Sequence, residues 1–157
     1  MEKEGIDALL KSHRFFEGMD AETLALIAGC GKNVRFPAGG YLARQGRAAD
    51  RFYAVREGRV ALELQAAEKG VLVLQTVRTG EILGWSWLFP PYVWTFDARA
   101  IDDVRGVEFD GTCLRAKCEA NTAMGFDLMR RFATVFANRM EAAVLQLLDM
   151  YGKSGPA

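Results

Sequence analysis

Short runs of alternating apolar and polar residues, broken by glycine-containing turns, fill the middle of the chain. Val60, Leu62 and Leu64 alternate with polar or small residues directly after a Glu57-Gly58 turn. Side chains at every second position lie on one face of a β-strand. The pattern contains about eight such runs, with a turn about every 8–12 residues, which is typical of a sandwich or barrel. We therefore predict an eight-stranded antiparallel β-roll, or jelly roll, over residues 33–109.

Helical spacing replaces this alternation before the roll, over residues 1–32. Ile6, Leu9 and Leu10 lie three to four positions apart, as on one face of a helix. Asp20 is a suitable N-cap for a second helix, because its carboxylate can accept a hydrogen bond from a free backbone amide. We predict a mainly β fold with short N-terminal helices, organised as a single domain over 1–157.

Residues 110–151 predict a short helix and then a long one of about thirty residues, or roughly 45 Å. A small roll cannot cover that length, so the distal half needs another surface. Pairing with the same helix of a second copy is the simplest solution, because a two-fold axis makes one stripe self-complementary. The alternative is a helix folded over its own sheet. Residues 152–157 are expected to be a disordered tail. The positions expected in the homodimer stripe are Phe132, Phe136, Met140, Ala143, Leu147 and Tyr151.

Composition argues against several classes of function. Twenty basic and twenty acidic residues cancel, whereas nucleic-acid binding draws most of its affinity from excess positive charge. The chain contains one histidine, His13, so clustered metal ligands and a histidine-based catalytic triad are not expected. No apolar segment reaches membrane-spanning length, and the charged N-terminus does not resemble a signal peptide. We expect a cytoplasmic protein that is not an enzyme, spans no membrane and does not bind nucleic acid directly.

Three cysteines, Cys30, Cys113 and Cys118, do not have the spacing of a metal site. Free buried thiols are the expected state in a reducing compartment. A redox sensor is the alternative.

Residues 80–100 have a composition that regular secondary structure does not require. They hold all three tryptophans and two of the four prolines, and they begin with Gly80 and Gly84. Such a loop can bend tightly and present flat apolar surface. It is expected either to cradle a ligand or to fill the place where a ligand would bind.

The order of these elements resembles the cyclic nucleotide-binding domain family from Phe15 to about Tyr151. This family includes the sensor domains of catabolite-activator-type regulators. Each motif is weak alone, but their order and spacing are specific. The matching residues are Phe36-Pro37-Ala38-Gly39, Gln45-Gly46, Ala49-Asp50-x-x-Tyr53-x-Val55, Glu57-Gly58-x-Val60 and Gly80-Glu81-Ile82-Leu83-Gly84.

The resemblance places residues 80–100 on the family's phosphate-binding cassette, but two anchors of that cassette are replaced. The family's glutamate, which holds the ribose, corresponds to Trp85, and its phosphate-binding arginine corresponds to Trp94 or Thr95. Arg99 is the nearby cation, and it either pairs with Asp97 on the strand or substitutes for the missing arginine. The candidate residues of this remodelled site are Glu81, Gly84, Trp85, Ser86, Trp87, Trp94, Thr95 and Arg99.

The resemblance implies a stand-alone regulatory module without a DNA-binding domain, which acts on an effector protein when a ligand moves the long helix. Its cofactor is not assigned; a cyclic nucleotide or another small anionic ligand is the candidate. The alternative is a ligandless interaction or scaffold domain. The tryptophans are accordingly expected to fill the pocket, to stack on a ligand or to dock a partner.

Overall fold

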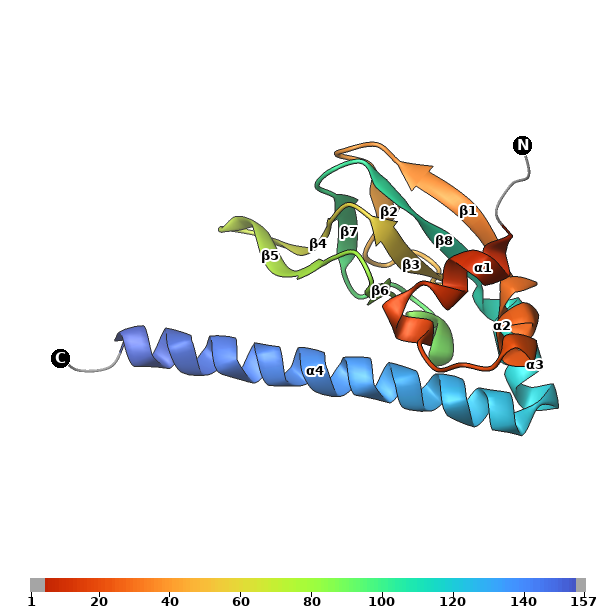
Figure 1. Cartoon of the computed structure of the whole chain (residues 1–157). Helices are drawn as coiled ribbons and strands as arrows, with labels where there is room; N and C mark the ends of the chain where they lie inside the picture. Colours follow the sequence, from red (N-terminus) through yellow and green to blue (C-terminus); the bar gives the residue numbers. More distant parts are fainter. Residues whose placement is uncertain (1–4, 155–157) are drawn as a thin grey trace. The chain divides into compact units, whose positions relative to one another are not determined.

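Eight antiparallel strands form two four-stranded sheets in the computed structural model, which describes residues 5–154. The strands are β1 (Gly31–Phe36), β2 (Tyr41–Ala43), β3 (Arg51–Glu57), β4 (Val60–Ala66), β5 (Gly70–Val77), β6 (Ile82–Leu83), β7 (Asp97–Ala100) and β8 (Val104–Asp110). The sheet orders are β1-β8-β3-β6 and β2-β7-β4-β5 (Figure 1). The predicted antiparallel roll is confirmed.

The inner faces of the two sheets form the main core. Tyr53 and Val55 of β3 belong to this core together with Val60 and Leu62 of β4, and none of the four is more than 4% exposed. Burial is not restricted to the alternating positions, because Ala54 of β3 and Ala61 and Glu63 of β4 are also buried. Burial also raises the pKa of Tyr53 to about 12, and its hydroxyl donates to the Leu42 carbonyl at 3.3 Å.

Short helices cover one end of the roll and enclose a second apolar layer. They are α1 (Ile6–Lys11), the 3₁₀ helix η1 (Arg14–Phe16), α2 (Ala21–Ala28) and α3 (Gly111–Ala120), and Figure 1 shows α1, α2 and α3 together at that end. The expected cap is present, since Asp20 Oδ1 accepts from the Thr23 amide at 2.7 Å. In the layer below, the rings of Phe52 and Phe109 stack with centroids 4.6 Å apart, and Phe16 packs on Phe109.

The chain divides after Ala120 into two compact units, and the second is the long helix α4 (Thr122–Ser154). Asn121 caps it, with Oδ1 accepting from the Met124 amide at 3.1 Å. The long C-terminal helix is thus confirmed. The expectation of a disordered tail is wrong for residues 152–154, which continue the helix, and residues 155–157 lie outside the described residues.

The expectation of three free thiols is wrong for two of them. Cys30 and Cys113 form a disulfide with their Cα atoms 5.8 Å apart. They are separated by 83 positions, so no local spacing signals the pairing. Cys118 remains a half-buried thiol, and burial raises its pKa.

This disulfide closes a long loop, which restricts the unfolded chain. We expect its reduction to lower the free energy of unfolding by roughly 4 kcal/mol, which corresponds to a fall in Tm of roughly 10 °C for a chain of this size. Calorimetry with and without a thiol reductant measures the difference, and Cys118→Ser should show the same fall. An unchanged Tm after complete reduction would contradict the prediction.

Candidate functional site

Residues 80–96 connect the two sheets and form the candidate site. Gly80 and Gly84 have φ angles of 87° and 104°, a region that side chains rarely permit. Between them β6 pairs with β3, a short strand that the sequence alternation did not reveal. Residues Ser86–Leu88 form the 3₁₀ helix η2.

Trp94 occupies the space beside the second glycine. A Cβ atom on Gly84 would lie 2.8 Å from Cη2 of the Trp94 ring, so only glycine allows this approach. Trp94 is 8% exposed and belongs to the main core between the sheets. Its backbone is held on both sides, because its amide donates to the Arg47 carbonyl and its carbonyl accepts from the Gly46 amide, both at 2.9 Å.

Trp94 borders two cavities. An open groove of about 410 Å³ is lined by Trp94 together with Arg44, Arg47 and Arg51, whereas the cavity between Trp94 and Gly84 has a volume of about 10 Å³. A cavity of about 10–15 Å³ is needed to hold one water molecule. Its lining residues are Leu62, Leu83, Gly84, Trp85, Ser86, Trp94, Thr95, Phe96 and Ala98. None of these lining residues carries a charge, and the remaining space is too small for a nucleotide.

Trp87 lies in the other apolar layer, away from that cavity. It is fully buried, and its ring stacks on Phe52 with centroids 5.1 Å apart and an interplanar angle of 16°. Arg115 of α3 donates from Nη1 to the Trp87 carbonyl and lies over the ring of Tyr92, 4.4 Å from its centroid. Arg115 was not predicted as a site residue, because nothing in the sequence links α3 to this loop.

The other candidate residues occupy different surroundings. Trp85 is half-buried and meets Phe96 edge to face at 5.9 Å, whereas Ser86 is buried and Thr95 is exposed. The Glu81 carboxylate accepts from the Arg78 amide at 2.8 Å. Five of the eight candidates therefore line the residual cavity, namely Gly84, Trp85, Ser86, Trp94 and Thr95, while Glu81, Trp87 and Arg99 do not.

Arg99 points to the outer face of its sheet, since its neighbour Ala98 faces the core. Its guanidinium binds Glu63 through two hydrogen bonds, Nε to Oε1 at 2.9 Å and Nη2 to Oε2 at 3.1 Å. This carboxylate raises the pKa of Arg99. The expected Asp97–Arg99 pair is wrong, because Asp97 instead lies 3.5 Å from Arg44 Nε and accepts from the Gln45 amide.

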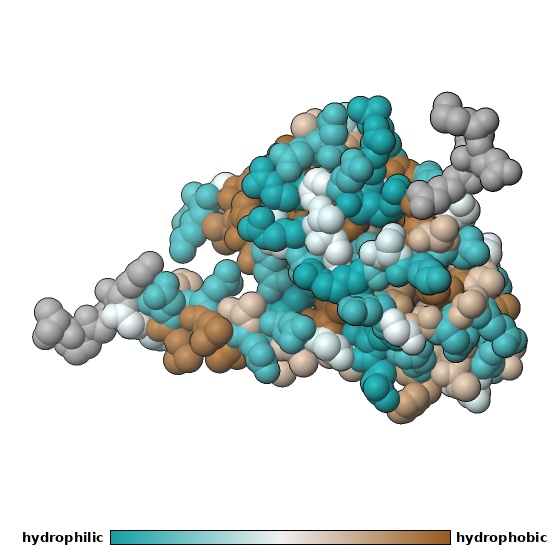
Figure 2. Space-filling model, in the orientation of Figure 1, coloured by the Kyte–Doolittle hydropathy of each residue, from teal (hydrophilic) through white to brown (hydrophobic). Residues whose placement is uncertain are grey.

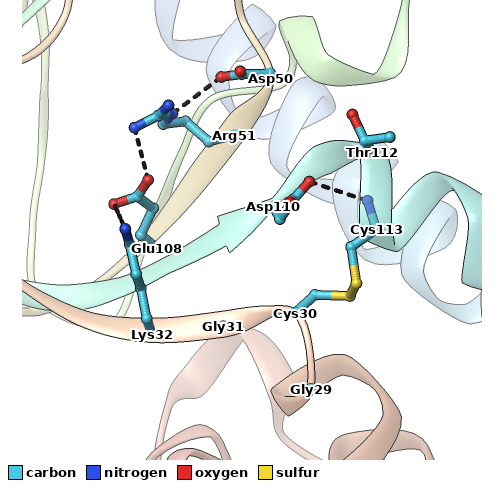
Figure 3. A pocket seen from close by; sticks show the side chains of 10 residues that line it. All are labelled: Gly29, Cys30, Gly31, Lys32, Asp50, Arg51, Glu108, Asp110, Thr112 and Cys113. Carbon is cyan, nitrogen blue, oxygen red and sulfur yellow. Dashed lines mark hydrogen bonds and ion pairs between the residues drawn. A yellow bond between two sulfur atoms is a disulfide. The ribbon is translucent and has the colours of Figure 1, made fainter.

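A larger groove of about 450 Å³ lies at the disulfide (Figure 3). Arg51 lies at its side and contacts both Asp50 at 3.0 Å and Glu108 at 2.8 Å, while Asp110 Oδ1 accepts from the Cys113 amide. Its walls come from segments that are distant in sequence, so spacing could not predict it.

Across residues 5–154 there is no cluster of three metal-ligating side chains and no helix able to cross a membrane.

The positions expected in the homodimer stripe lie on α4. Met140, Leu147 and Tyr151 are 65%, 54% and 74% exposed, and Ala143 is also exposed. Nearer the start of the helix, Phe132 is 1% exposed and Phe136 is half-buried, and their rings contact each other with centroids 6.4 Å apart. The expectation that Phe132 lies in an exposed dimer stripe is therefore wrong.

Comparison with known proteins identifies relatives along most of the chain. The CRP-like cAMP-activated global transcriptional regulator of Mycobacterium tuberculosis is 25% identical over 145 residues. The alignment covers 92% of this chain and 63% of the relative, so the chain spans less than two thirds of the length of the curated relatives that it matches.

Solved structures share the fold. A putative cyclic nucleotide-binding protein from Geobacter metallireducens superposes with a TM-score of 0.76 at 31% identity, covering 88% of this chain and 99% of that one. The sensor domain of the transcriptional regulator DNR from Pseudomonas aeruginosa superposes with a TM-score of 0.68 at 21% identity, covering 85% and 89%, which shows the fold alone. The sequence profile described as "Cyclic nucleotide-binding domain" matches residues 33–121, more than half of the chain. The chain belongs to the cyclic nucleotide-binding domain family.

Proposed function

We propose that this chain is a regulatory module of the cyclic nucleotide-binding type whose nucleotide site is filled by its own Trp94. It acts through protein contacts, and cAMP and cGMP are not its ordinary ligands. Of the two functions expected from the sequence, the geometry favours the ligandless interaction domain over the sensor. Location in the cytoplasm stays a prediction.

The packing of Trp94 against Gly84 carries this proposal. The space left beside them is about 10 Å³, whereas small-molecule sites are typically on the order of 300–1,000 Å³. A nucleotide would have to expel the indole from the core. If the backbone of Trp94 moved as well, the two hydrogen bonds that hold it to Arg47 and Gly46 would also break.

Charge supports the same conclusion. None of the residues that line the cavity is a cation, and Arg99 is bound to Glu63 on the outer face of the sheet. Burying a phosphate without a counter-charge costs on the order of several kcal/mol. The buried Ser86 hydroxyl and nearby amides offset part of that cost.

A second function is favoured by the parts of the cassette that are kept. Gly80 and Gly84, which match the family's glycine motif, both have positive φ, and Ser86–Leu88 form the short helix η2. A small anionic ligand with a flat ring that stacks on Trp85 and displaces Trp94 would make the module a sensor with altered specificity.

The partner surface that we propose is the distal part of α4. At 100° per residue, Met140, Val144, Leu147 and Tyr151 fall within a stripe of roughly 60°, and all four are exposed. Figure 2 shows hydrophobic residues gathered near the C-terminal end of this helix. Such a stripe fits the same helix of a second copy; an effector protein would bind the resulting dimer.

Calorimetric titration tests the filled site. We expect no saturable heat when cAMP, cGMP or cyclic di-GMP is added, because Trp94 blocks the site and no cation lines it. Arg99→Ala should behave as the unmodified chain. The double variant Trp85→Glu/Trp94→Arg removes the indole and supplies both missing anchors, so it should gain cAMP binding. Saturable micromolar binding to the unmodified chain would contradict the proposal and favour the sensor.

Truncation of Trp94 tests its role in the core. Trp94→Ala should lower the free energy of unfolding by about 3–5 kcal/mol, the usual cost of emptying a buried aromatic site. The half-buried Trp85 is the matched control, and Trp85→Ala should cost clearly less. Denaturant titration measures both, and an equal cost at the two positions would contradict the assignment of Trp94 as the filling residue.

Light scattering tests the homodimer. A negative charge inside the apolar stripe, as in Leu147→Glu, should convert a dimer to a monomer, because the two-fold axis brings the charge to the interface twice. Ala142→Glu adds the same charge on the opposite side of α4 and should leave the dimer intact. If the unmodified chain is a monomer, or both variants remain dimers, the stripe is not the dimer interface.

A further inference from the structure

The Cys30–Cys113 disulfide is a covalent link between two segments that are distant in sequence, which also meet through the Asp110 amide donating to the Cys30 carbonyl at 2.9 Å. Cys30 stands between α2 and β1, and Cys113 lies in the first turn of α3. Figure 3 shows the bond running from Cys30 on the first segment to Cys113 on the second. The disulfide therefore ties the N-terminal helices to the helix that follows the roll.

The disulfide lies where a small reagent can reach it. Both cysteines line the groove, which has a volume of about 450 Å³. Cys30 is 7% exposed, while Cys113 is half-buried and follows the exposed Thr112. The residues next to Cys30 in the chain, Gly29 and Gly31, have no side chains that could cover it. Because Cys113 is the more exposed of the two cysteines, attack by a thiolate is favoured at the Cys113 sulfur.

Helix α3, which carries Cys113, also contacts the tryptophan-rich loop of residues 80–96. Two residues beyond Cys113, Arg115 donates to the Trp87 carbonyl and covers the ring of Tyr92. Trp87 and Tyr92 flank the segment 88–91 in the sequence. The Arg115 guanidinium therefore contacts the loop on both sides of this segment. The position of α3 therefore affects the loop directly.

We propose that Cys30–Cys113 is a reversible thiol–disulfide exchange site whose co-reactant is a dithiol, and that its oxidation state sets how tightly α3 holds the loop. A thiolate of the dithiol attacks the Cys113 sulfur, forming a mixed disulfide and expelling Cys30 as a thiolate that takes up a proton. The second thiol of the reagent then attacks the mixed disulfide and releases Cys113. The disulfide gains two electrons and two protons, and the dithiol becomes a cyclic disulfide.

Reduction leaves weaker contacts in place of the covalent one. Lys117 Nζ still donates to the Leu26 carbonyl at 2.6 Å, and the Gly111 amide still donates to the Asp50 carbonyl at 2.7 Å. The fold is therefore retained, while the first turn of α3 becomes freer and the contact of Arg115 with the loop weakens. This inference does not depend on whether the cassette takes a ligand.

Tryptophan emission reports this change, because Trp85, Trp87 and Trp94 are all in the loop and are the only tryptophans in the chain. The full chain is incubated with dithiothreitol without denaturant, and its thiols are counted by alkylation and mass. We expect two additional thiols, together with red-shifted emission and stronger quenching by acrylamide. Circular dichroism should be unchanged, and oxidised dithiothreitol should reverse the emission shift.

Matched variants separate the parts of the proposal. Cys118→Ser should respond as the unmodified chain. Cys113→Ser and Cys30→Ala cannot form the disulfide, so they should show the red-shifted emission of the reduced protein with or without dithiothreitol. Arg115→Met should still release two thiols, but its emission should not follow. The proposal is overturned if the thiols appear only in denaturant, if they appear without a shift in emission, if the shift cannot be reversed, or if Arg115→Met responds like the unmodified chain.

Discussion

The contact between the Trp94 ring and the Gly84 backbone is the interaction on which the rest of the site depends. It requires a glycine with positive φ, because a Cβ atom would collide with the ring. It also joins the loop to the main core, since Trp94 belongs to the same core cluster as Tyr53, Leu62 and Ala98. The loop that the family resemblance assigns to the phosphate-binding cassette therefore contributes Trp94 to the hydrophobic core.

The tryptophans of this one loop pack into different apolar layers of the molecule. Trp94 fills the space between the two sheets, whereas Trp87 packs on Phe52 beneath the helices. Arg115 then connects the loop to α3, and the disulfide connects α3 to the N-terminal segment. The loop is thus held from both sides of the β3–β8 sheet. This arrangement allows a change at the disulfide to reach the loop without a bound ligand.

Elements with a regular period could be predicted from the sequence, and contacts between distant segments could not. Alternation revealed β3 and β4, helical spacing revealed α4, and the glycine-containing motifs indicated the family. Alternation could not reveal the two-residue strand β6. The partner of Arg99 was missed because Glu63 lies 36 positions away, on the neighbouring strand. The pairing of Cys30 with Cys113 and the contact of Arg115 with Trp87 likewise depend on the closed roll, which no local pattern encodes.

Fluorine NMR of the chain labelled with 5-fluorotryptophan tests the central claim, that Trp94 fills the nucleotide site, most directly. Single Trp→Phe substitutions assign the three resonances. If Trp94 is buried against Gly84, its resonance shows no solvent isotope shift between H₂O and D₂O, and cAMP or cGMP at millimolar concentration does not move it. A solvent-sensitive Trp94 resonance, or one that shifts saturably with nucleotide, would show that the site is open and would contradict the account.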